Sequence, residues 1–141
     1  MFEGAASLLF SLASRENVLL GIATGKSHRG VERFIEANGL RGVFATLQTA
    51  GSAPSKPHPA MLLQAMSETG AVPETTVMIG DTSYDMIMAA CAKVPGIGVS
   101  WGYHTPADLK RAGAKAVASS FPALSALLAG REQTQSYGAV A

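Results

Sequence analysis

The sequence predicts an α/β fold in which a largely parallel sheet is covered by helices on both faces. Short apolar runs typical of buried strands alternate with segments whose apolar residues repeat at helical spacing. The 141 residues are 48% hydrophobic and only 15% charged, which is enough apolar side chain for one globular domain. The net charge of +1 provides no electrostatic basis for binding nucleic acid or an anionic membrane, so we expect neither as a partner.

The elements follow from local pattern. A helix is predicted at residues 5–13, with one apolar face formed by Leu8, Leu9 and Leu12. This apolar run lacks the basic residues of a secretory signal. No apolar run in the sequence is long enough to span a membrane. Expected strands are residues 18–23, 43–47, 77–80, 97–100 and 115–118. Further helices are expected between Ser27 and Asn38, at 59–69, after Asp81, at 106–112 and at 122–129. Residues 131–141 are expected to form a polar, flexible tail.

The single cysteine, Cys91, lies in a run of small apolar residues. We interpret it as a buried packing residue of a protein kept in a reducing compartment, and we expect a cytoplasmic location. No disulfide can form within the chain, because it has one cysteine.

Two carboxylates four residues apart, Asp81 and Asp85, follow the apolar run that ends at Gly80. A strand that turns at its carboxyl end into a helix would place both carboxylates at the edge where α/β proteins bind ligands. Such a pair suits a hard cation such as Mg²⁺. The competing interpretation is that Asp81 or Thr82 caps the following helix, with Asp85 a solvated residue of its first turn.

The segment Thr24-Gly25-Lys26-Ser27 follows the first expected strand. A nucleotide-binding P-loop would require a glycine at position 20, where this chain has Leu20. The hydroxyl of Thr24 and free amides at a helix start would instead suit one phosphoryl group, while the simpler interpretation is a Ser27 cap.

Lys56 lies in the proline-rich loop 49–59, which holds it in an extended, restricted segment. By itself it is typical of a surface lysine. His58 and His104 are interpreted as loop or core residues, because nothing near them has metal-ligand spacing. Trp101 and Tyr103 would line a pocket mouth or cover the core.

Three segments in this order resemble motifs two, three and four of the haloacid dehalogenase-like phosphohydrolases, in the phosphoglycolate-phosphatase-like branch. They are residues 23–27 (Ala-Thr-Gly-Lys-Ser), 55–59 (Ser-Lys-Pro-His-Pro) and 79–86 (Ile-Gly-Asp-Thr-Ser-Tyr-Asp-Met). Residues 97–104 resemble the strand and loop that follow. The resemblance covers about residues 3–129 and implies a Rossmann-like, three-layer parallel sheet, with residues 1–130 as an incomplete core domain.

The resemblance implies a Mg²⁺-dependent phosphatase of a small phosphorylated metabolite such as phosphoglycolate. Thr24 and the amide of Gly25 would hold phosphoryl oxygens, and Lys56 would offset charge on the phosphoryl group. Asp81 would bind Mg²⁺ directly, and Asp85 would assist the metal shell or orient Lys56. In that family an aspartate attacks phosphorus, and the clamp around it stabilises the transition state electrostatically.

The family's first motif, a strand ending in Asp-x-Asp, is missing. The chain has three aspartates, Asp81, Asp85 and Asp108, and none forms that pattern. We therefore interpret the chain as the carboxy-terminal part of such an enzyme, as a gene fragment, a split product or a truncated chain, inactive by itself. The missing strand belongs at the sheet centre, so we expect a rearranged sheet, a homodimer or a complementing chain.

Two other interpretations remain at this stage. In one, the chain is a non-catalytic module that binds phosphate or Mg²⁺ through Thr24, Lys56 and Asp81, or binds a partner protein at its sheet edge. The weaker one is a receiver-like doubly wound domain, whose phospho-accepting acid would have to be Asp81. One departure from relatives is Lys93, where they tend to have glycine; it would affect only a turn.

Overall fold

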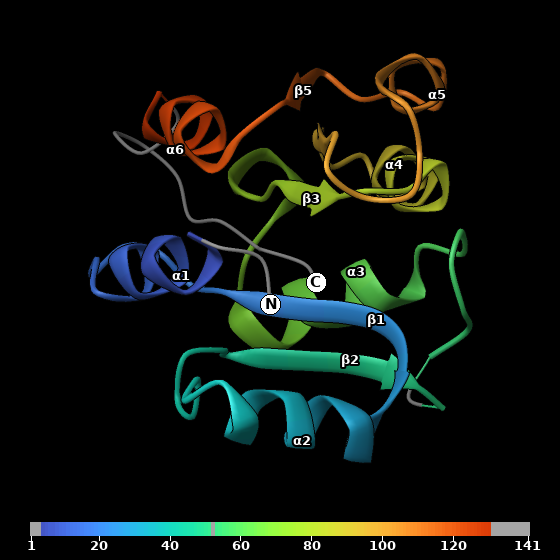
Figure 1. Ribbon diagram of the computed structural model, residues 1–141. Coiled ribbons are helices and arrows are strands. Elements are labelled where there is room, and N and C mark those ends of the chain that lie inside the picture. Colours follow the sequence, from blue (N-terminus) through green and yellow to red (C-terminus); the bar gives the residue numbers. More distant parts are fainter. Residues whose placement is uncertain (1–3, 52, 131–141) are drawn as a thin grey trace.

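The computed structural model describes residues 4–51 and 53–130 and consists of alternating helices and parallel strands (Figure 1). The expected tail at residues 131–141 lies outside the described residues. The elements in chain order are α1 (Ala5–Ala13), β1 (Gly21–Ser27), α2 (His28–Ala37), β2 (Thr46–Ala50), α3 (Ala60–Thr69), a 3-10 turn (Pro73–Thr75), β3 (Met78–Gly80), α4 (Ser83–Cys91), β4 (Gly96–Val99), α5 (Pro106–Arg111), β5 (Ala116–Ala118) and α6 (Phe121–Ala129). The predicted α/β class is confirmed.

The strands form two parallel sheets. β1 pairs with β2, and β3, β4 and β5 form a second sheet in that order. No backbone pairing joins β1 to β3 within residues 4–51 and 53–130. The expected rearranged sheet is therefore not formed by direct pairing of these two strands. Completion of the sheet by a homodimer or a complementing chain stays a prediction.

Side chains hold the two sheets together on both faces. One apolar cluster joins Leu20, just before β1, to Val77 and Ile79 beside and in β3. The other joins Ala23 of β1 to Met78 of β3, together with methionines of α3 and α4. Since each cluster contains side chains from both sheets, the boundary between β1 and β3 lies inside one packed core.

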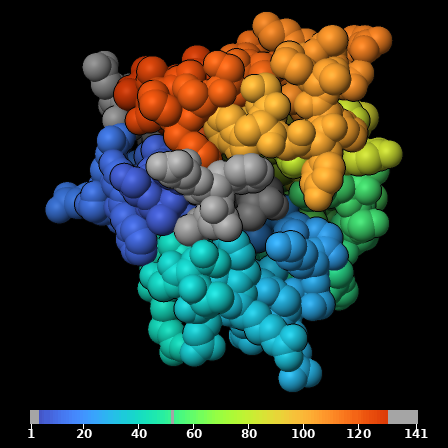
Figure 2. Space-filling view, in the orientation of Figure 1, coloured from blue at the N-terminus to red at the C-terminus, as the bar shows by residue number. Residues whose placement is uncertain are grey.

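The terminal helices of the described chain pack against each other. Figure 2 shows α1 in blue beside α6 in orange-red, on one side of the molecule. Leu12 is buried, and Leu8 and Leu9 pack against the same apolar cluster, as the predicted helix face requires. Within the described residues, no helix is long and apolar enough to cross a bilayer.

Two strands begin and end later in the chain than the sequence predicts. β1 was expected to end before Thr24, yet it runs to Ser27, with a register shift between Ala23 and Ser27. β2 was expected at residues 43–47 but covers Thr46–Ala50. β2 can include the polar residue Gln48, which is 1% exposed, because its side chain is hydrogen-bonded. Nε2 of Gln48 donates to Glu68 Oε2 of the neighbouring helix α3 at 2.7 Å and to Thr46 Oγ1 of the same strand at 3.1 Å. This network allows polar side chains to be buried in a strand.

The prediction for Cys91 was wrong. Its side chain is exposed at the end of α4, because Met88, Ala89 and Ala92 face the core and leave Cys91 on the outer side of the helix. Relatives are expected to have glycine where this chain has Lys93, and the backbone gives the reason. Lys93 has φ 61°, in the left-handed region that glycine adopts without a Cβ penalty.

Candidate active site

The candidate site lies where the carboxyl ends of parallel strands meet. Asp81 after β3 and the loop after β4 share this edge, because β3 and β4 are parallel neighbours. Although β1 lies in the other sheet, it runs in the same direction as β3 (Figure 1), which places Thr24 toward the same edge. Thr24 is 7% exposed, and its hydroxyl oxygen accepts a hydrogen bond from the Lys26 amide at 3.2 Å. This local turn occupies the stretch of β1 where the register shifts. The neighbouring Gly25 is exposed, with no atom near the place where a Cβ would stand.

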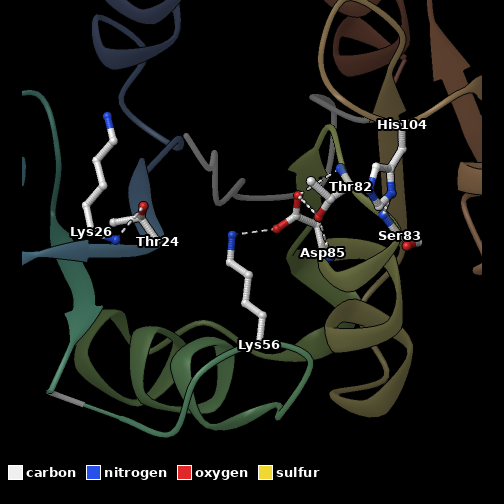
Figure 3. A network of polar contacts seen from close by, with 7 residues as sticks. All are labelled: Thr24, Lys26, Lys56, Thr82, Ser83, Asp85 and His104. Carbon is white, nitrogen blue, oxygen red and sulfur yellow. Dashed lines mark hydrogen bonds and ion pairs between the residues drawn. The ribbon is translucent and has the colours of Figure 1, made fainter.

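Lys56 and Asp85 form an ion pair between two separate elements. Nζ of Lys56, in the loop before α3, lies 2.5 Å from Oδ1 of Asp85 in the first turn of α4. The Lys56 side chain is 19% exposed and that of Asp85 is 3% exposed, so the pair is largely removed from water. In the view of Figure 3, the Lys56 ammonium lies between Thr24 and the Asp85 carboxylate, while the Lys26 ammonium points away.

Asp85 also completes the start of α4. Its Oδ2 accepts hydrogen bonds from the Thr82 amide at 3.1 Å and the Thr82 hydroxyl at 3.0 Å. In return, Thr82 Oγ1 accepts from the Asp85 amide at 3.2 Å. This is a capping box, so the expectation of a Thr82 cap is confirmed. The companion expectation of a solvated Asp85 is wrong, because the cap and Lys56 together bury its carboxylate.

Asp81 occupies the turn between β3 and α4 and is held by the loop after β4. The Tyr103 amide donates to Asp81 Oδ2 at 3.2 Å, and the His104 amide donates to the Asp81 carbonyl at 3.2 Å. Oδ1 of Asp81 accepts no hydrogen bond from the described part of the chain. A half-buried carboxylate with one free oxygen is a suitable ligand for a hard cation.

The fit to Mg²⁺ is partial within this chain. Asp85 is committed to Lys56 and Thr82, which leaves Asp81 as the available carboxylate at this edge. Across residues 4–51 and 53–130 there is no group of three histidine, cysteine or acidic side chains that could hold a metal. Because Mg²⁺ keeps several waters and binds through one or two carboxylates plus phosphate oxygens, Asp81 fits as one of its ligands.

Sequence reasoning missed the roles of both loop histidines. His104 Nδ1 accepts a hydrogen bond from the Ser83 amide at 2.8 Å, at the start of α4. His58 Nδ1 accepts from the Ala60 amide at 3.1 Å, at the start of α3. Each bond spans loop and helix, and no spacing in the sequence indicates it. Of the two aromatic residues in the same loop, Trp101 packs on Phe121 over the core, whereas Tyr103 is 91% exposed.

A separate cavity of about 420 Å³ lies between α2 and β2. Its walls include Ile35, Leu40 and Phe44, and none of the expected site residues lines it.

Comparison with known protein families shows to which family this chain belongs. Residues 1–99 match the family model described as haloacid dehalogenase-like hydrolase. The chain belongs to this family. The expected resemblance is therefore confirmed.

Individual relatives are phosphatases by name. The chain is 39% identical over 122 residues to a Dickeya dadantii protein named "Probable phosphatase IndB", covering 86% of this chain and 53% of that protein. It is 31% identical over 104 residues to a Synechococcus elongatus phosphoglycolate phosphatase, covering 74% and 48%. A solved hydrolase from Pseudomonas syringae superposes with a TM-score of 0.81 at 29% identity, covering 92% and 60%. The chain spans about half the length of the curated relatives it matches.

Proposed function

We propose that this chain is the phosphate- and metal-holding part of a Mg²⁺-dependent phosphoric monoester hydrolase that acts on a small phosphorylated metabolite of the phosphoglycolate type. The observation that carries the proposal is the Lys56–Asp85 ion pair, which brings a cation to the strand edge beside Asp81 in a chain of this family. The phosphatase names of the relatives support the reaction class.

Each residue of the site has a proposed task. Thr24 and the Gly25 amide would bind phosphoryl oxygens, and Lys56 would offset their negative charge while Asp85 orients its ammonium. Asp81 would ligate Mg²⁺, which supplies charge stabilisation of the phosphoryl group when bound. The 141 residues contain no Asp-x-Asp, so a nucleophilic aspartate has to come from outside them, and we expect these residues alone to be inactive.

The boundary between β1 and β3 is the proposed place of that missing segment. The described strands leave these two edges without backbone pairing to each other, and both run parallel to their sheet neighbours. A parallel strand added there would place the residue after its carboxyl end between Thr24 and Asp81. The supplier would be a segment outside these 141 residues, on the same protein or on a complementing chain, because a second copy of them brings no Asp-x-Asp.

The test is hydrolysis of p-nitrophenyl phosphate and of 2-phosphoglycolate with Mg²⁺. The purified chain is assayed alone and mixed with the part of the Dickeya phosphatase that lies outside the 122 matched residues. We expect turnover only in the mixture, and its loss in the mixture made with Asp81→Ala. Turnover by the chain alone that Asp81→Ala abolishes would overturn the requirement for an added segment. A silent mixture in which the two polypeptides bind each other would favour a non-catalytic module.

A further inference from the structure

The loop after β4 makes four contacts around Asp81. A Cβ at Gly102 would collide with the Asp81 carboxylate, so only glycine lets the backbone lie against this side chain. The next two amides donate to Asp81, that of Tyr103 to Oδ2 and that of His104 to the backbone carbonyl, both at 3.2 Å. The His104 ring then accepts from the Ser83 amide at 2.8 Å.

We propose that residues 102–104 are positioning residues for Asp81, which hold its Oδ2 so that Oδ1 alone faces the cation. This inference rests on the proposed role of Asp81 as a Mg²⁺ ligand. The bond from the Tyr103 amide fixes one carboxylate oxygen, and the His104 amide fixes the backbone that carries it. Two attachments on one residue leave its carboxylate little rotational freedom.

His104 joins this loop to α4. A backbone N–H can only donate, so Nδ1 of His104 is the acceptor and its proton is on Nε2. The ring lies 6.0 Å from that of Tyr84, measured between centroids and tilted by 56°, which limits its movement on one side. Loop and helix start therefore move together, with Asp81 between them.

Gly102 lies so close to Asp81 that a side chain at this position would collide with the carboxylate. Its φ is not among the positive values in the chain, so its requirement for glycine comes from the Asp81 carboxylate and not from backbone conformation. A methyl group there would have to displace the carboxylate or the loop. We therefore expect Gly102→Ala to weaken Mg²⁺ binding about 10- to 100-fold, as for other residues that orient metal ligands.

The first measurement needs no metal. Amide hydrogen exchange by NMR is followed in the full chain at Tyr103 and Ser83. We expect the Tyr103 amide to exchange about tenfold more slowly in the wild type than in Asp81→Ala, and the Ser83 amide to lose its protection in His104→Ala and keep it in His104→Asn, whose Oδ1 can replace Nδ1 as acceptor. Equal exchange at Tyr103 in wild type and Asp81→Ala would overturn the proposal.

The second measurement titrates Mg²⁺ into the same chains and follows the amide shifts of residues 81–85. Gly102→Ala and His104→Ala should bind more weakly, His104→Asn should bind close to the wild type, and two matched controls should bind as the wild type does. The controls are Gly130→Ala, whose added Cβ meets nothing closer than 3.6 Å, and His58→Ala, which loses a similar helix-start bond elsewhere.

The outcomes separate the two proposals. If wild type and Asp81→Ala respond equally to Mg²⁺, the proposed metal site fails and takes the positioning role with it. If binding depends on Asp81 but is unchanged in Gly102→Ala and His104→Ala, the metal site stands and the positioning role is wrong.

Discussion

The ammonium of Lys56 lies 2.5 Å from the carboxylate of Asp85, although 29 residues separate them in the chain. The pair closes the loop before α3 onto the first turn of α4. Because the Asp85 carboxylate is buried and also accepts hydrogen bonds from Thr82, its negative charge is stabilised both by Lys56 and by Thr82. A single contact thus links the helix start to the lysine that the proposed chemistry needs.

Removing the lysine should destabilise the fold. Lys56→Met leaves the buried Asp85 carboxylate with only its Thr82 bonds, and we expect a loss of about 2 kcal/mol in the free energy of unfolding. Urea denaturation measures it, with the exposed Lys110→Met as the matched control. Combining Lys56→Met with Asp85→Ala should cost less than the sum of the two single changes; simple additivity would mean that the pair contributes nothing.

The two threonine caps should differ in importance. Thr82 and Thr105 each accept a hydrogen bond from the amide three residues on, at 3.2 and 3.1 Å. Losing such a cap typically costs about 1 kcal/mol. Each hydroxyl also bonds the carboxylate at that third position, but the Asp85 side chain is buried and that of Asp108 is 46% exposed. Thr82→Ala should therefore cost more than Thr105→Ala. Thermal unfolding of the two variants checks the order, and equal losses would show that burial of the bonded carboxylate makes no difference to the stability of the cap.

Lys93 is a site where glycine should stabilise the chain. Its φ of 61° is disfavoured for a residue with a Cβ, so Lys93→Gly should raise the free energy of unfolding by about 1 kcal/mol. Lys115→Gly serves as the control and should lower it, since Lys115 does not have a positive φ and glycine adds only chain entropy. A destabilised Lys93→Gly variant would contradict the strain inferred here.

The Asp108 carboxyl should titrate at unusually low pH. A side-chain hydrogen bond from Thr105, assisted by the charge of Arg111 at 2.8 Å, lowers the pKa of Asp108 below its ordinary value. A pKa lower in the folded than in the unfolded state stabilises the fold above the unfolded pKa, and this stabilisation is lost as pH falls through the folded pKa. A ¹³C NMR titration measures the midpoint. Thr105→Ala should raise it more than Arg111→Ala does, and the reverse order would refute the assigned cause.

Local patterns predicted most of the fold. Apolar periodicity and capping residues located the helices, including the Ser27 cap, whose hydroxyl accepts from the Gly30 amide at 3.0 Å. They failed where distant groups decide. β2 begins three residues later than expected because Glu68, on another element, makes the burial of Gln48 tolerable. Cys91 is exposed because the core lies on the other side of its helix.

The candidate site divides in the same way. The order of the motifs along the chain was enough to name Thr24, Lys56, Asp81 and Asp85 and to show that Asp-x-Asp is absent. The burial of Asp85 against Lys56, and the contacts of residues 102–104 with Asp81, could be seen only in the folded chain. The physical reason is that caps and amphipathic faces depend on neighbours three or four residues away, whereas these contacts span 21 to 29 residues and exist only once the strands have aligned.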